Sequence, residues 1–217
     1  MKTLLMESLY FSRTYAGSIF RIIGPFFIAM ALFGGYTYMI EDEPGWLSVA
    51  YLTVFIGGQS FYICRLIKFM GSVVSGSEVD LSVSVSEWFR LLIVHILYGI
   101  AVLVGILALI IPGIYMSAKF GFAEFECVLN KRSPMEALGS SWEQTKGHVK
   151  TLMLGVFTIT ITGILFDLLL DWIGEMAPDL MLPLGVLSEL GSSIVVVLVS
   201  VFYFRVYVST LEKGDTQ

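Results

Sequence analysis

The sequence predicts a single all-α integral membrane domain over residues 1–217, with six transmembrane helices and short cytoplasmic interfacial helices. The first observation is composition: 56% of the residues are hydrophobic and 14% are charged, whereas a soluble domain carries about 25% charged residues. The mean hydropathy is +0.83. The second is charge sorting. All Lys and Arg side chains except Lys119 can be placed on one side of a membrane, opposite the acids at 41–43 and 171–179. The positive-inside rule then predicts that both termini are cytoplasmic.

Six apolar segments are long enough to cross a bilayer, which takes about 20 helical residues for a hydrocarbon layer of roughly 30 Å. The predicted spans are 17–40, 46–69, 89–111, 113–129, 151–172 and 184–210. Pro112 and Gly113 stand between the third and fourth spans and predict a tight turn on the outer side. An even number of spans returns the C-terminus to the cytoplasm, in agreement with the charge sorting.

Each odd-numbered span follows a polar stretch that contains an aromatic residue and a cation, at 7–13, 84–90 and 140–146. This pairing is typical of a short helix in the membrane interface, and it predicts three units of surface helix plus hairpin. The alternative is that aromatic and basic residues gather at any cytoplasmic boundary. The interfacial candidates are Trp88, Arg90, Ser141, Trp142 and Lys146.

The segments between the spans differ in character. Ser133 as N-cap, Pro134 at the first helical position and Glu136 in the first turn predict a helix from 134 to about 146. Residues 71–81 are rich in Ser, Gly and Val and predict a flexible loop. Gly and Pro residues interrupt 173–183, which we expect to form an irregular cap on the outer surface.

The fourth span contains three ionisable residues, Lys119, Glu124 and Glu126, and such groups inside a membrane are candidate functional sites. At about 100° per residue, Lys119 and Glu126 share one helical face. The opposite face carries Gly113, Ser117, Gly121 and Glu124. Small residues at this spacing allow a neighbouring helix to approach closely, so the span is expected to lie centrally in the bundle.

A buried Lys119 needs a partner, since a charge in hydrocarbon costs roughly 2.5 to 3.5 kcal/mol on insertion scales. Lys119 lies about 9 Å from the predicted outer turn, and Asp167 lies at a comparable depth in the fifth span, with Glu189 as a second candidate. Lys119 either holds helices together or contacts a substrate or lipid phosphate in a polar cavity.

Two further pairs of polar residues each have two interpretations. His95 and Glu126 are expected to meet near the inner side, as a pair that titrates near neutral pH or as a satisfied interfacial histidine. Asp167 and Asp171 share a helical face at i and i+4, which suits either a cation-binding pair or an acidic outer rim.

No catalytic residue, metal site or cofactor is predicted, because the sequence lacks hydrolase, metalloprotease, P-loop and dinucleotide-binding motifs. Cys64 and Cys127 are expected to be small buried hydrophobic residues and not a disulfide. A pI of about 5.0 without a basic run argues against nucleic-acid binding.

Two segments carry a family resemblance: Ile111-Pro112-Gly113-Ile114-Tyr115-Met116-Ser117-Ala118-Lys119-Phe120 and Ala137-Leu138-Gly139-Ser140-Ser141-Trp142-Glu143-Gln144-Thr145-Lys146-Gly147. They resemble the YciC-type bacterial inner-membrane proteins and, more distantly, the membrane domain attached to some glycerophosphodiester phosphodiesterases. The shared pattern is an aliphatic-Pro-Gly turn, a basic residue soon after it, and Ala-Leu-x-x-Ser-Trp-x-x-Thr-x-Gly. Lys119 stands where that family commonly has Arg, which disfavours bidentate phosphate recognition. The resemblance implies a multi-pass protein of the bacterial inner membrane with no established chemistry.

Two function classes follow. The first is a non-enzymatic membrane protein with a structural or accessory role in the cell envelope, whose partners are membrane lipids and other inner-membrane proteins. The alternative is a transporter or lipid-handling protein with a polar cavity around Lys119 and Asp167. An intramembrane enzyme ranks last. A cavity that reaches Lys119 would favour the second class, and a sealed Lys119 the first.

Overall fold

The computed structural model describes residues 2–38 and 45–214, and every regular element in these two stretches is helical. In chain order the elements are α1 (Lys2–Thr14), α2 (Ala16–Tyr38), α3 (Gly45–Ser75), α4 (Val85–Ala108), α5 (Ile110–Phe120), α6 (Ala123–Val128), α7 (Pro134–Gln144), α8 (Val149–Met176), the 3₁₀ turn η1 (Pro178–Leu180) and α9 (Met181–Gly214). The acids predicted at 41–43 and the last residues of the first predicted span lie outside the described residues.

Within the described residues, five helices are long and apolar enough to cross a membrane: α2, α3, α4, α8 and α9. Their outward faces carry large apolar side chains, such as Leu107 on α4 and Leu165 on α8, which are 78% and 60% exposed. Apolar surface of this extent is suited to lipid and not to water. The prediction of an all-helical, multi-pass membrane protein is confirmed at this level.

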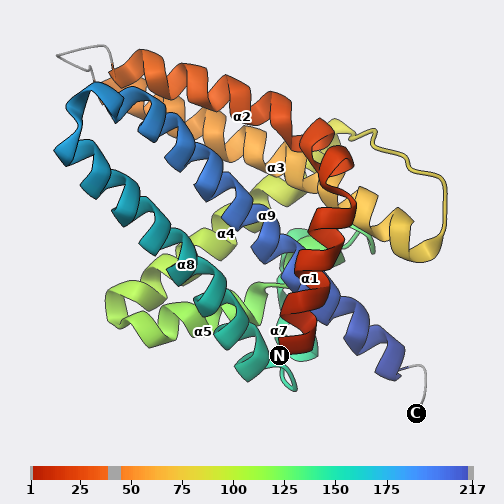
Figure 1. Cartoon of the computed structure of the whole chain (residues 1–217). Coiled ribbons are helices and arrows are strands. Elements are labelled where there is room, and N and C mark those ends of the chain that lie inside the picture. The colour runs from red at the N-terminus through yellow and green to blue at the C-terminus, as the bar shows by residue number, and fades with distance from the viewer. Residues whose placement is uncertain (1, 39–44, 215–217) are drawn as a thin grey trace.

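Helix α9 forms the centre of the bundle. Half of the residues in its most apolar stretch are buried, against 11–28% of those in the other four helices that are long enough to cross a membrane. Figure 1 shows it crossing between the α2–α3 pair and α8. Its C-terminal half supplies a run of buried side chains, Val201, Phe202, Phe204 and Tyr207, that other helices pack against. The N-terminal helix α1 is tied to it by an ion pair of 2.7 Å between Glu7 and Arg205 Nη2.

The turn between α4 and α5 lies three residues before its predicted place at Pro112 and Gly113. Leu109 is extended (φ −172°, ψ 155°) and caps both helices. Pro112 can lie inside α5 because a helix leaves its first N–H groups without intrahelical partners. Gly113 instead permits close packing: a Cβ built on Gly105 of α4 would lie 2.8 Å from the Gly113 Cα.

The fourth predicted span is not one continuous helix. It consists of the 11-residue α5 and the 6-residue α6, with a break at Gly121 and Phe122. Neither piece alone is long enough to cross a bilayer.

Other segments confirm or correct the predictions. Helix α7 begins where Ser133, Pro134 and Glu136 predicted it and has the full capping box. Helix α3 continues to Ser75, so the predicted 71–81 loop begins only at residue 76. The segment 173–183 is largely helical rather than irregular, because α8 runs to Met176 before η1 begins. Of the three expected surface helices, 7–13 lies in α1 and most of 140–146 in α7, but Ser84 caps α4 directly and residues 85–90 are its first turns.

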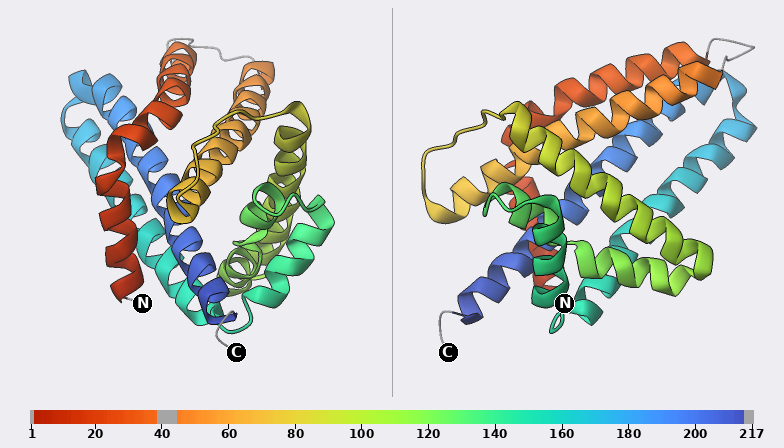
Figure 2. Two further views of the ribbon diagram at one scale, coloured as in Figure 1. Left: turned by 90° about the vertical axis from the view of Figure 1, so that its right-hand side faces the viewer. Right: turned by 180° about the vertical axis from the view of Figure 1, so that it is seen from behind.

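The α8–η1–α9 connection lies at the upper left of Figure 1 and the α4–α5 turn at the lower left, which become the upper and lower right in the right-hand view of Figure 2. The 76–84 loop and the end of α9 lie on the opposite side in both views.

Gly105→Ala should destabilise the α4–α5 hairpin by about 1 to 3 kcal/mol, because its methyl group would overlap backbone atoms that cannot rotate away. Gly99→Ala on the same helix is a matched control, since its Cβ would meet nothing within 4 Å and alanine favours a helix by up to about 1 kcal/mol. Unfolding in detergent with increasing SDS measures both. Equal midpoints for the two variants would contradict the close α4–α5 approach.

Candidate functional site

The break between α5 and α6 is the candidate site, because α7 packs against both helices there. Figure 1 shows α7 next to the end of α5. The Ser-Trp-x-x-Thr stretch of α7 faces the break, so the two segments that carried the family resemblance meet in space.

Ser141 satisfies the backbone on both sides of the break. Its Oγ donates to the Lys119 carbonyl at 2.8 Å and accepts from the Phe122 N–H at 3.0 Å. The Thr145 hydroxyl lies 3.2 Å from the same carbonyl. A helix end leaves such groups without partners, and a buried unpaired group costs about 1 to 3 kcal/mol. Because Ser141 and Thr145 are both fully buried, these hydroxyls take the place of water.

Lys119 is sealed against Trp142. Its side chain is 2% exposed, its ammonium donates to the Trp142 carbonyl, and Nζ lies 4.6 Å from the centroid of the indole ring. This is a cation–π geometry. The indole ring also contacts Tyr115 and Phe120 of α5, at centroid distances of 6.1 and 5.4 Å. Lys119 therefore fastens α7 to α5.

The predicted pairing of Lys119 with Asp167 is wrong. Among the described residues no ion pair links Lys119 to an acid; Asp167 accepts from the Ser188 hydroxyl at 2.8 Å, and Glu189 accepts from Tyr51 at 3.3 Å. The physical reason is the position of the turn. With Leu109 as the turn, Lys119 lies about 15 Å along the helix from it, at the level of α7. Asp171 is exposed on α8.

His95 lies beside Glu124. The predicted partner, Glu126, is not in contact with it. Its Nε2 lies 3.0 Å from Glu124 Oε1, and its Nδ1 lies 2.7 Å from the Ser60 hydroxyl. This row of polar groups joins α4, α6 and α3. The prediction matched His95 and Glu126 by depth alone, whereas Glu124 and Glu126 point about 200° apart around α6 and only Glu124 faces α4.

Glu126 is 1% exposed and has three partners. It accepts from Tyr207 at 3.0 Å and from Gln144 at 2.7 Å, and its second oxygen pairs with Arg132 Nε at 3.1 Å. These contacts join α6 to α9, to α7 and to the loop between α6 and α7. No pattern in the sequence pointed to Tyr207 or Gln144 as site residues.

The small residues of the fourth segment permit close packing, as predicted, but against two different helices. Gly113 packs on α4. Tyr203 of α9 covers the other two: its hydroxyl donates to the Ser117 carbonyl at 3.0 Å, and a Cβ on Gly121 would lie 2.4 Å from its ring.

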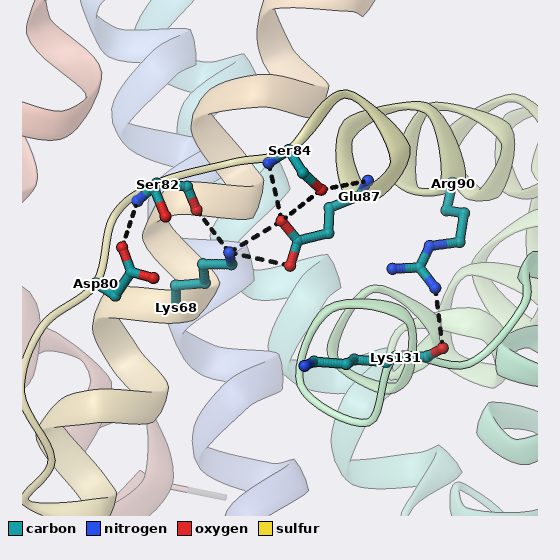
Figure 3. A network of polar contacts seen from close by, with 7 residues as sticks. All are labelled: Lys68, Asp80, Ser82, Ser84, Glu87, Arg90 and Lys131. Carbon is teal, nitrogen blue, oxygen red and sulfur yellow. Dashed lines mark hydrogen bonds and ion pairs between the residues drawn. The ribbon is translucent and has the colours of Figure 1, made fainter.

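A polar network joins the end of α3 to the start of α4 (Figure 3). Lys68 pairs with Glu87 at 3.1 Å and donates to the Ser82 carbonyl at 2.6 Å. Arg90 donates to the Lys131 carbonyl at 3.1 Å and so reaches the loop before α7.

The remaining interfacial candidates also have protein partners. The Trp88 indole donates to the Gly57 carbonyl at 2.9 Å. Lys146, just after the end of α7, pairs with Glu143 on the exposed face of that helix.

The described residues include no group of three or more His, Cys, Asp or Glu side chains able to hold a metal ion. Cys64 and Cys127 are free and buried. The polar side chains of this site thus bind to one another and to the backbone, and what the arrangement achieves is to fix α5, α6, α7 and α9 relative to each other.

Ser141→Ala should lower the free energy of unfolding by about 2 kcal/mol or more, because it strips the Lys119 carbonyl and the Phe122 N–H of a shared buried partner. The looser α7 should also be cut faster by trypsin after Arg132 and Lys146, which flank it. Ser86→Ala is the matched control, because it removes the same hydroxyl group at an exposed position. An unchanged tryptic pattern in Ser141→Ala would show that the hydroxyl does not hold the break.

Glu136 should make the docking of α7 depend on pH. The Ser133 hydroxyl and N–H donate to its carboxylate at 2.7 and 3.1 Å, and these bonds hold its pKa below the ordinary value of 4.5. A lowered pKa stabilises the fold above the ordinary value, and this contribution is lost as pH falls through the lowered one. Glu136→Ala should therefore reduce the melting temperature at about pH 6, and the difference from the unsubstituted protein should shrink by about pH 3. A difference that is constant with pH would contradict this account.

Comparison with known proteins gives one finding. A family model described as a domain of unknown function, DUF7847, matches residues 25–212. No curated protein and no solved structure matches the chain. The matched region runs from α2 into the last turns of α9 and includes the whole α5–α6–α7 site, so the chain belongs to the DUF7847 family.

Proposed function

We propose that this protein is a non-enzymatic, six-span protein of the bacterial inner membrane with a structural or accessory role in the cell envelope. Both termini, together with α7, would lie on the cytoplasmic side. Its partners would be membrane lipids and other inner-membrane proteins.

The sixth span in this proposal is the broken pair α5 and α6. Together they cover residues 110–128, roughly 28 Å of helix at 1.5 Å per residue, close to the roughly 30 Å of bilayer hydrocarbon. A break inside a span is tolerated where protein groups satisfy the backbone, and Ser141 does so here.

The burial of Lys119 is the observation that carries the proposed role. A cation that binds a substrate or a phosphate must be reachable, but Lys119 is 2% exposed and is held by the carbonyl and ring of Trp142. Glu126 is likewise enclosed by Tyr207 and Gln144. When charged side chains in the bundle make their hydrogen bonds to other helices of the same protein, they support a structural role over transport.

The alternative, a transporter or lipid-handling protein with a polar cavity around Lys119 and Asp167, has less support because the two residues have separate partners on different helices. The resemblance to YciC-type proteins favours the inner membrane as the location. It rests on the same turn, cation and Ser-Trp-x-x-Thr stretch that build the α7 contact.

The outer face of α7 is the surface that this role would use. Met135, Glu136, Gly139 and Glu143 are exposed on it, while Ala137, Leu138 and Ser141 face inward. A helix fixed in this way at the membrane boundary can present a constant surface to a partner protein.

Lys119→Met tests the proposal, since methionine keeps the length of the side chain and removes the charge and the donors. A structural Lys119 predicts a loss of about 1 to 3 kcal/mol, because the partly buried Trp142 carbonyl loses its charged donor, and faster tryptic cleavage around α7. Lys150→Met, at an exposed position in the first turn of α8, is the matched control. The proposal fails if Lys119→Met is as stable and protease-resistant as the unsubstituted protein yet cannot restore function in a deletion strain.

A further inference from the structure

Ser60, His95 and Glu124 form a row of polar side chains that joins α3, α4 and α6. The Nδ1 of His95 lies 2.7 Å from the Ser60 hydroxyl oxygen, and its Nε2 lies 3.0 Å from Glu124 Oε1. The Ser60 hydroxyl also lies 2.9 Å from the Ile56 carbonyl of its own helix, which can accept its hydrogen. The row therefore contains three contacts at hydrogen-bond distance.

These three contacts need one hydrogen more than the groups carry when His95 is neutral and Glu124 is ionised. A serine hydroxyl supplies one hydrogen, a neutral imidazole ring supplies one, and a carboxylate supplies none. When both ring nitrogens are protonated, Nδ1–H donates to Ser60, Nε2–H donates to Glu124, and the Ser60 hydroxyl donates to Ile56. All three contacts are thus hydrogen bonds at the same time only when the pair of His95 and Glu124 binds one additional proton. Imidazole is more basic than a carboxylate, so this proton belongs on the ring.

The charge of the pair favours the same protonated form. Without the additional proton the pair carries one negative charge, and with it the pair is neutral as a whole. Burial disfavours a net charge. Phenols and a thiol lie within electrostatic range of Glu124, and such groups are neutral at about pH 7. They are Tyr62 of α3, Tyr98 of α4, Tyr203 of α9 and Cys127 of α6.

Charged side chains elsewhere on the neighbouring helices have partners of their own. They are Arg65 of α3 over the Phe61 ring, Lys68 of α3 with Glu87, Arg90 of α4 with the Lys131 carbonyl, Lys119 of α5 with Trp142, Glu126 of α6 with Tyr207, Glu136 and Glu143 of α7 with Ser133 and Lys146, and Arg205 of α9 with Glu7. The charge that balances Glu124 must therefore come from His95.

A proton can reach this pair, whereas a larger reactant cannot reach Ser60. The side chains of His95 and Glu124 are 13% and 25% exposed. His95 follows Arg90 by roughly 8 Å along α4, so it lies near the charged end of that helix. Ser60 is fully buried, which excludes it as a nucleophile even though a serine, a histidine and an acid stand in one row.

We propose that His95 and Glu124 form a proton-binding site that stabilises the docking of α6 on α3 and α4 as the pH falls from about 8 to about 5. Histidine is the side chain that ordinarily changes its charge in this range. A proton bound by the folded pair stabilises the fold while it is bound, and this contribution is lost as the pH rises and the pair releases it. Glu126 of the same short helix accepts from Gln144 of α7, so the state of the pair also affects how firmly α7 is held.

A double-mutant cycle of His95→Gln and Glu124→Gln tests this site in the full chain in mild detergent. Glutamine keeps polar groups at both positions and is neutral at every pH. The coupling between the two positions, measured from the equilibrium constants of unfolding in SDS, should be at least about tenfold at about pH 5.5. At about pH 8.5 it should fall to about twofold or less, because the ring has lost its charge and one contact lacks a hydrogen.

Glu7→Gln with Arg205→Gln is the matched control cycle. The Glu7–Arg205 pair also joins two helices, at 2.7 Å, but it contains no histidine. Its coupling should be the same at both pH values. A coupling between His95 and Glu124 that is also the same at both pH values would overturn the proposal.

Nitrogen NMR of the imidazole ring detects the proton directly. The chain has two histidines, and His148→Gln identifies the signal of His95 by removing the other one. Both ring nitrogens of His95 should carry hydrogen at about pH 5.5, and Glu124→Gln should reduce this doubly protonated fraction because the imidazolium loses its carboxylate. A His95 ring with a single protonated nitrogen at this pH would contradict the site. Since the unsubstituted protein also gives this signal, the measurement decides the question if a variant of the cycle does not fold.

Discussion

The two hydrogen bonds of Ser141 are the constraint on which the rest of the site depends. A break in a helix leaves an N–H and a C=O without intrahelical partners, and such groups are costly when they are buried. One hydroxyl, held by α7, accepts from Phe122 and donates to Lys119 across the break. The break keeps these hydrogen bonds only while α7 is docked. The aromatic and charged contacts of Trp142 with α5 hold α7 in place and so help to stabilise the break.

The two acids of α6 have different neighbours because of their spacing. Glu124 reaches His95 on α4, while Glu126 reaches Tyr207 on α9 and Gln144 on α7. Residues at i and i+2 of one helix point about 200° apart around its axis, so the two carboxylates face opposite sides of α6. Tyr203 covers Gly121 closely, so α9 also packs against the break itself. Both carboxylates of α6 therefore have partners within the protein.

Elements that depend on short stretches of sequence could be predicted, whereas contacts between residues far apart in the sequence could not. Helix α7 is set by its capping box of Ser133 and Glu136, and five long helices follow from apolar length alone. The two wrong side-chain pairings have a related cause. Lys119 was matched with Asp167, and Glu126 with His95, by depth along a single helix over 113–129 with a turn at Pro112. Tyr203, Tyr207 and Ser60 are ordinary residues in apolar segments, and only the fold brings them to the site.

The sorting of positive charge and the position of Lys119 can now be reconciled. Counted from Pro112, Lys119 is an exception, because it falls in the outer half of a span. Counted from Leu109, it lies about 15 Å from the turn and its ammonium reaches α7, the helix flanked by Arg132 and Lys146. A long aliphatic stem can run through apolar surroundings while its charged end reaches the boundary. If α7 lies on the cytoplasmic side, as proposed, the charged end of Lys119 is directed toward the same side as the other twelve cations. Its burial then reflects the docking of α7 over its charged end, and not a cavity built to use that charge.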